Sequence, residues 1–174
     1  MLKRFFLLII LLSFSSLNNL LAQDGIAFID LNYLFNNSLA GKKINEQIQK
    51  KTKILNSEVT TFREKISKEK EKLITQKNVI SKDEYNKKLA VLEKDVQNFN
   101  ENINKKQRDL MTFKNNARNE FSKKLNIILE EFSSKNSIAM ILRKENLLIG
   151  KKSLDVTKNI LELFDKNVKK ITIL

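Results

Sequence analysis

The chain has 174 residues, with no Cys, His, Pro or Trp and only three Gly, and its formal net charge is +13. This length predicts one domain or one compact body with an extension, and the lack of Pro and Gly argues against a loop-rich fold. The absence of Cys excludes disulfides and Cys-based zinc sites. The absence of His removes the commonest general base and metal ligand.

Residues 1–22 have the pattern of a secretory signal peptide. Lys3 and Arg4 precede a short apolar run, polar residues interrupt that run, and Ala22 is a suitable last residue before cleavage. The alternative is a membrane anchor, but an uninterrupted span needs about 20 apolar residues and this run is far shorter. The sequence therefore predicts cleavage after about Ala22 and a mature protein in the periplasm of a bacterium.

The mature chain begins with a short apolar run at residues 26–31, which follows Gly25 and predicts a strand. Residues 32–35 predict a helical turn, and residues 36–38 are of the types that form turns or helix caps. We therefore expect a strand and a short helical turn ahead of the long central segment.

In the central segment, residues 42–135, apolar residues recur at spacings of three and four. This spacing places them on one narrow stripe of a helix, as in a coiled coil. Ser81 and Glu84 form a capping-box pattern in the middle of the segment, which predicts the start of a second helix. The segment is therefore predicted to be an antiparallel helical hairpin, with a first arm of roughly 55 Å.

The pattern changes after residue 135. Apolar runs at residues 138–142 and 147–149 flank a four-residue polar break, and Gly150 ends the second run. This arrangement predicts a β-hairpin. Asp155 then predicts an N-cap for a final helix, whose apolar face would contain Val156, Ile160, Leu163, Phe164 and Val168.

Short strands and a two-helix arm that buries one stripe are each marginal as isolated units. Oligomerisation through the strands would solve this problem. The predicted oligomerisation body therefore consists of residues 23–41 and 136–174, and its contact residues are Ile26, Phe28, Ile29, Ile138, Met140, Ile141, Leu147 and Ile149.

The positive charge is concentrated on the arm, since residues 42–135 contain 23 basic and 14 acidic side chains. Drift in the composition of an AT-rich genome could supply much of this excess, but the resulting field acts on partners in either case. Lysine pairs such as Lys87-Lys88 and Lys105-Lys106 are also compatible with a nucleic-acid footprint. We favour a solvated coiled-coil face, because no aromatic side chains are interleaved with these lysines.

The sequence shows no catalytic constellation. A nucleophilic serine would need a base, and no pattern marks a Ser–Lys dyad; there is no glycine-rich phosphate loop. Acidic pairs such as Asp83-Glu84 are better explained as helix caps and solvated faces. We expect neither an enzyme nor a bound cofactor or metal.

The order of these parts resembles the Skp/OmpH family of periplasmic chaperones. The most specific local similarities are Ile29-Asp30-Leu31, which leads through Tyr33-Leu34-Phe35 to Gly41-Lys42, and Asp155-Val156-Thr157. The resemblance covers the whole mature chain. It implies an α+β, mostly α, fold in which a long helical hairpin stands on a small β-sheet body, assembled as a homotrimer.

The resemblance also implies an ATP-independent holdase that binds unfolded outer-membrane β-barrel precursors between its arms. The alternatives are a structural coiled-coil protein of the envelope and a basic nucleic-acid-binding protein, although we expect no nucleic acid. Anionic lipid or lipopolysaccharide stays open as a further ligand, and no site for it is assigned. The residues expected to contact clients are Lys65, Lys68, Lys72, Lys87, Lys88 and Lys94 on the arm, with Val79 and Ile80 at its tip.

Overall fold

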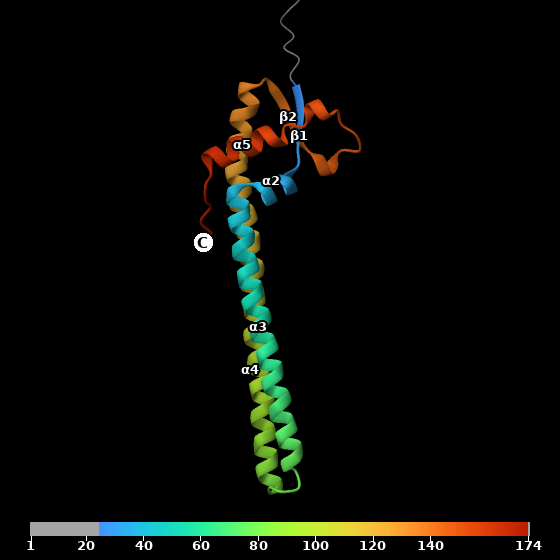
Figure 1. The fold of residues 1–174 in the computed structure, drawn as a ribbon, viewed down its shortest axis with the longest axis vertical. Helices are drawn as coiled ribbons and strands as arrows, with labels where there is room; N and C mark the ends of the chain where they lie inside the picture. Colours follow the sequence, from blue (N-terminus) through green and yellow to red (C-terminus); the bar gives the residue numbers. More distant parts are fainter. Residues whose placement is uncertain (1–24, 174) are drawn as a thin grey trace, which may run out of the picture.

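The computed structural model describes residues 25–173, in which a compact body stands at one end of a single long helical hairpin (Figure 1). The hairpin consists of α3 (Leu39–Gln76) and α4 (Lys82–Lys135). This mostly helical architecture with a small sheet confirms the predicted fold class. The predicted signal peptide, residues 1–22, lies outside the described residues. None of the helices in the described region combines the length and hydrophobicity needed to cross a bilayer.

Two capping residues set the path of the chain into the arm. Asp30 caps α2 (Leu31–Asn37), because its carboxylate accepts a 2.8 Å hydrogen bond from the Tyr33 N–H. Ser38 then caps α3 by accepting a 3.1 Å bond from the Gly41 N–H. The predicted helical turn after the first strand is thus a short helix, and the long helix begins three residues before the predicted start of the arm.

The distal turn of the arm lies where the capping box predicted it. The Ser81 hydroxyl accepts a 3.2 Å hydrogen bond from the Glu84 N–H and starts α4. The Glu84 carboxylate pairs with Lys88 at 3.2 Å. Because α4 has 54 residues and α3 has 38, α4 continues past the root of α3 into the body, as Figure 1 shows.

The predicted β-hairpin after residue 135 is wrong. Strand β2 (Ile138–Arg143) pairs in parallel with β1 (Gly25–Ile29), with Ile26 opposite Met140 and Phe28 opposite Leu142. The whole arm is the crossover between them. The chain then turns through the 3₁₀ helix η1 (Lys144–Asn146), and residues 147–149 belong to no strand.

The physical reason for this difference lies around Phe28. The segment after a second 3₁₀ helix, η2 (Lys152–Leu154), returns to β1, where the Val156 N–H donates a 3.0 Å bond to the Phe28 carbonyl. Gly150 lies against the ring of Phe28, so that a Cβ atom added to Gly150 would be 2.9 Å from Cε1 of Phe28. The second apolar run is therefore part of a loop that projects from the body and does not pair with β2.

The core of the body lies where α4 passes α2 and α5 (Thr157–Asn167). The ring of Phe121 packs against Phe35, with centroids 5.0 Å apart, and against Phe164, with centroids 4.7 Å apart. Ile160 and Phe164 are fully buried, which confirms the predicted apolar face of the last helix. Asp155 accepts hydrogen bonds from Thr157 as expected of a cap, although the helix begins one residue later than that prediction implies.

Candidate functional site

The interior of the arm uses most of the apolar stripe for its own packing. In the distal half, Ile66, Leu73 and Leu92 are buried between the helices. Nearer the middle, the rings of Phe62 and Phe99 stack with centroids 3.7 Å apart. These contacts hold α3 and α4 together, so a partner must bind to what remains on the outside of the arm.

Three shallow cavities follow one another along one side of the arm, and we call this row the side groove. Their volumes are about 280, 530 and 460 Å³. The first two share Ile54, Glu58 and Lys106, and the Lys65–Asp95 ion pair joins the second to the third. Most of the lining residues on α3 recur at steps of three and four, as one helix face requires. The residues in this series are Lys51, Ile54, Glu58, Thr61, Lys65, Glu69, Lys72 and Gln76, and the neighbouring Leu55, Ser57, Phe62 and Leu73 complete the α3 lining.

Polar contacts between the two helices cross the side groove at three levels. Lys106 Nζ lies 2.6 Å from Glu58 Oε2, and Lys65 Nζ lies 3.6 Å from Asp95 Oδ2. Further out, Lys88 Nζ donates a 3.1 Å bond to Gln76 Oε1. These side chains are partly or fully exposed to solvent, and each such ion pair contributes only about 0.2–1 kcal/mol. A ligand could therefore replace them at little cost.

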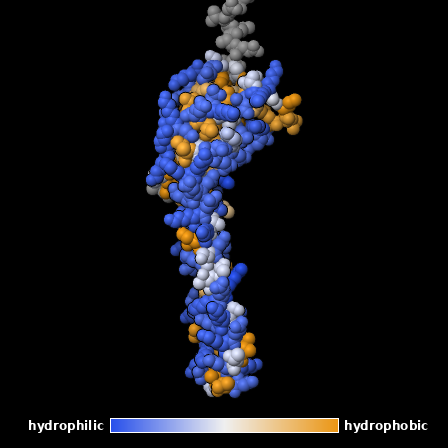
Figure 2. Space-filling model, in the orientation of Figure 1, coloured by the Kyte–Doolittle hydropathy of each residue, from blue (hydrophilic) through white to orange (hydrophobic). Residues whose placement is uncertain are grey.

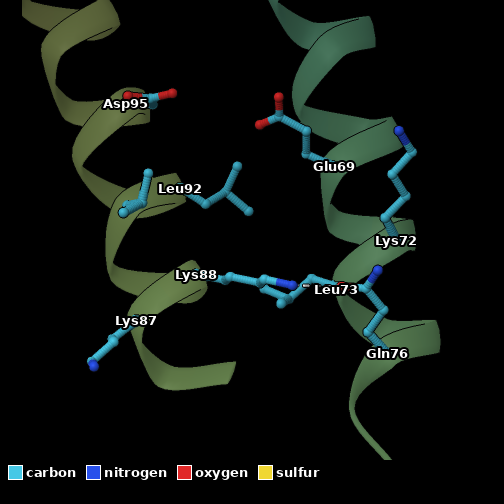
Figure 3. A pocket seen from close by; sticks show the side chains of 9 residues that line it. Glu69, Lys72, Leu73, Gln76, Lys87, Lys88, Leu92 and Asp95 are labelled. Carbon is cyan, nitrogen blue, oxygen red and sulfur yellow. Dashed lines mark hydrogen bonds between the residues drawn. The ribbon is translucent and has the colours of Figure 1, made fainter. Parts of the chain in front are cut away.

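The distal cavity of the side groove contains three of the six predicted lysines, namely Lys72, Lys87 and Lys88. Figure 3 shows Lys88 extending across this cavity toward α3, whereas Lys87 points away from it. Lys65 lines the middle cavity. The other predicted residues lie elsewhere on the arm: Lys68 and Lys94 are exposed, Val79 at the tip is 81% exposed, and Ile80 is half-buried.

Sequence reasoning missed several apolar residues exposed on the arm. Ile74 is 68% exposed and Val91 is 62% exposed, and both lie in the distal half; Ile54 and Met111 are also exposed nearer the body. Val91 lines the side groove, whereas Ile74 lines a cavity of about 420 Å³ on the opposite side of the hairpin. The sequence could have identified these residues as exposed, because they fall outside the stripe of apolar residues, spaced three and four apart, that predicts the interior of the hairpin.

A polar network in the body joins the start of α2 to the start of α5. The Asp30 N–H donates a 2.9 Å bond to Thr157 Oγ1, and Asp155 Oδ1 accepts bonds from the Thr157 N–H at 3.0 Å and its hydroxyl at 2.5 Å. Lys144 lies 3.7 Å from Asp30 and 3.9 Å from Asp155. Burial raises the pKa of Asp155, but the Thr157 hydrogen bonds and the nearby Lys144 and Lys158 outweigh it and lower the pKa.

Residues 25–164 carry the similarity of this chain to a known protein family. The sequence profile of the family described as outer membrane protein (OmpH-like) matches this range. The chain belongs to the OmpH-like family. A crystal structure of an OmpH-like outer membrane chaperone candidate from Caulobacter crescentus CB15 superposes with a TM-score of 0.77 at 18% identity. The match covers 86% of this chain and 88% of that one, so the fold is shared. Curated proteins gave no significant match.

The two motifs behind the resemblance to OmpH-like proteins meet in the polar network. Asp30 comes from the first motif, and Asp155 and Thr157 come from the second. Within the described residues, no cluster of acidic, His or Cys side chains is suitable for holding a metal ion. The hydrogen bonds of the network join the start of α2 to the start of α5, and exposed apolar side chains lie on the arm and on the body.

Several apolar side chains are exposed on the surface of the body of this OmpH-like chain. Three of the predicted oligomerisation residues are exposed, namely Ile26, Met140 and Ile149, and the neighbouring Leu148 is fully exposed as well. Figure 2 shows apolar side chains gathered on the loop that projects from the body. Ile138, Ile141 and Leu147 are half-buried, whereas Phe28 and Ile29 are buried within the chain itself.

Proposed function

We propose that the protein is an ATP-independent periplasmic holdase chaperone, which binds unfolded outer-membrane β-barrel precursors between its helical arms and prevents their aggregation. Family membership over residues 25–164 supports a role in outer-membrane protein assembly. The observation that carries the proposal is the outer surface of the arm, where exposed Ile54, Ile74 and Val91 stand among lysines. Binding without catalysis or a cofactor is the function that such a surface favours.

In this proposal each contact between the arm and a client is weak, and the affinity comes from many contacts acting together. An exposed charge contact contributes about 0.2–1 kcal/mol, and an isolated exposed apolar side chain can bury only part of its surface against a client. Many such contacts along the arm, repeated on several arms, would raise the effective concentration of the client near the surface. A client held in this way can still rearrange and leave, as a holdase without ATP requires.

We further propose a homotrimer in the periplasm, formed after cleavage near Ala22. Its body would comprise residues 23–41 and 136–174, and each chain would contribute an arm from residues 42–135. The sheet within the described residues has only two strands, which is marginal on its own. The exposed Met140 and Ile149 would lie at the contacts between chains.

Light scattering on the mature protein tests this assembly. Met140→Asp or Ile149→Asp should dissociate it, because each would place an unpaired charge in an apolar contact. Both side chains are exposed in the single chain, so its fold should survive the change. Phe28→Asp is a poorer test, since it would also unfold the body. A folded monomer of the unsubstituted protein at micromolar concentration would contradict the trimer.

The holdase proposal is tested by diluting a urea-unfolded outer-membrane protein into buffer with the mature protein and no ATP. Suppressed light scattering is the expected result. Replacing Ile74 and Val91 together with Ser should weaken suppression, whereas replacing the exposed Ser67 and Asn100 with Ala should not. No suppression at all would favour a structural spacer. Saturable DNA binding with a steep salt dependence would favour the nucleic-acid alternative, and binding to anionic vesicles would identify lipid as a ligand.

A further inference from the structure

The side groove continues toward the body as one face of α4. On α4, the residues Lys88, Val91, Asp95 and Lys106 line the groove. They belong to one series whose members are spaced three or four residues apart. The same series then reaches Asn116, Glu120 and Lys123, which line one edge of a cavity of about 510 Å³. Asn119, Ser122 and Asn126 line it from further around α4, and Thr172 lines it from the C-terminal segment. Residues in one such series share one face of a helix. The C-terminal segment therefore lies next to the continuation of this face at the root of the arm.

The C-terminal segment, residues 169–173, is bound to the root of the arm as an extended chain. It follows the end of α5 at Asn167 and belongs to no helix or strand. Ile171 is 5% exposed and Ile173 packs against the core, whereas Thr172 between them is exposed. Over residues 171–173, burial thus alternates as it does along a strand with one apolar face. The Lys43 ammonium group also donates a 3.1 Å bond to the Lys169 carbonyl.

We propose that the open part of the side groove binds one extended segment of a client, with alternating apolar and polar residues, in the way that the root of the arm holds the chain's own C-terminal segment. This inference rests on the proposed function and names the part of the client that is recognised. The occupant would be a single transmembrane β-strand of an unfolded barrel precursor. Such strands alternate apolar and polar side chains with a period of two.

The length of the groove agrees with this occupant. Its α3 lining runs from Lys51 to Gln76, which corresponds to about 38 Å at the helical rise of about 1.5 Å per residue. A transmembrane β-strand has about 9–11 residues, and at about 3.3 Å per residue it spans roughly 30–36 Å. One strand would therefore fill the groove from end to end.

The chemistry of the groove also suits an amphipathic strand. Exposed Ile54 and Val91 lie toward its two ends, and the Phe62–Phe99 stack lines its middle. Between these apolar points, the Lys106–Glu58 and Lys65–Asp95 pairs present donors and acceptors. An isolated strand has unpaired backbone N–H and C=O groups along both edges, and these exposed charged groups can bond to them.

Site-specific cross-linking tests the inference, and the absence of Cys from the chain makes single labelling sites possible. Asn102→Cys places a benzophenone label in the side groove. Asn100→Cys is the matched control, since it is exposed on the same helix but lies about 200° around it. A urea-unfolded outer-membrane barrel protein is the client. We expect several-fold more cross-linking from position 102 than from position 100.

Competition identifies the recognised segment. A peptide of about ten residues with the alternating sequence of one barrel strand should reduce cross-linking from position 102. A peptide of the same composition with its apolar residues grouped at one end should reduce it several-fold less. Equal competition by the two peptides, or equal cross-linking from positions 100 and 102, would overturn the inference.

The aggregation assay, run in parallel, separates this inference from the proposed function. If both Cys variants suppress aggregation but cross-link equally, the groove is not the strand site and the holdase proposal stands. If the unsubstituted protein does not suppress aggregation, the holdase proposal is wrong and the strand site falls with it.

Discussion

The backbone N–H of Asp30 donates a 2.9 Å hydrogen bond to the hydroxyl of Thr157, across 127 residues of sequence. The same hydroxyl donates to Asp155 Oδ1 at 2.5 Å, so one side chain both accepts and donates. The entire arm lies between these two residues in the chain. The bond therefore joins the part of the body that precedes the arm to the part that follows it.

Thr157→Val should destabilise the body by about 1–3 kcal/mol, because valine has a similar shape but leaves the Asp30 N–H without its acceptor. Thr157 is 5% exposed, so water cannot easily replace the hydroxyl. Urea denaturation of the mature protein measures the change. Thr60→Val on the exposed face of α3 is the control and should have little effect. Equal changes in the two variants would show that the network adds no stability.

The lowered pKa of Asp155 predicts a particular loss of stability in acid. Its folded-state pKa lies below the usual value of 3.8, so its ionised form stabilises the fold above that value. This contribution is lost as the pH falls through the folded-state pKa. Asp155→Asn cannot titrate, yet it keeps an oxygen that can accept from Thr157.

Thermal unfolding between neutral pH and about pH 2 should therefore show a smaller fall in Tm for Asp155→Asn than for the unsubstituted protein. At neutral pH the variant should be the less stable of the two, since it loses the attraction to Lys144 and Lys158. Parallel curves for the two proteins over the whole pH range would contradict this account.

The helices of the arm could be predicted from sequence because their signals are local. The three-and-four spacing fixes which face packs inward, and Ser81 marks the distal turn through its own hydrogen bond to Glu84. The strands β1 and β2 were both predicted from their apolar runs, but their parallel pairing could not be predicted in this way. Strand β2 pairs with β1 across the length of the arm, and the short apolar run at residues 147–149 resembles a strand whether or not it has a partner.

The side groove also lies beyond what the sequence can show directly. Its two walls come from different helices, and their alignment depends on which turn of α3 faces which turn of α4. The Lys65–Asp95 and Lys106–Glu58 pairs reveal that alignment. Single exposed residues such as Ile74 could have been found, because they interrupt the polar face of the predicted helix.

Gly41→Ala should destabilise the protein by about 1–3 kcal/mol, the usual cost of overpacking. A Cβ at Gly41 would lie 1.7 Å from the Phe35 carbonyl oxygen, so α2 and α3 would have to separate. This cost exceeds the gain that alanine normally brings within a helix. Gly25→Ala is the matched control, since its Cβ would meet its nearest neighbour at 3.5 Å. Similar Tm values for the two variants would refute the close approach.

Charge reversal on the distal arm should slow client capture. Lys68, Lys72, Lys87 and Lys94 are exposed and form no ion pair within residues 25–173, so their charges act on the surroundings. Changing all four to Glu should lower the association rate of an acidic unfolded client and remove most of its salt dependence, because long-range steering is electrostatic. Stopped-flow fluorescence at several salt concentrations measures both quantities.

The control for this experiment reverses four exposed lysines of the body, Lys151, Lys152, Lys166 and Lys170, which changes the net charge by the same amount. Its effect should be smaller if the position of the charge matters. Changing Val79 and Ile80 at the tip to Ser should instead speed client release and leave the salt dependence unaltered, because only apolar contact is lost. If capture responds neither to salt nor to the arm reversals, the lysine excess reflects composition alone and the client is held by the apolar residues of the arm.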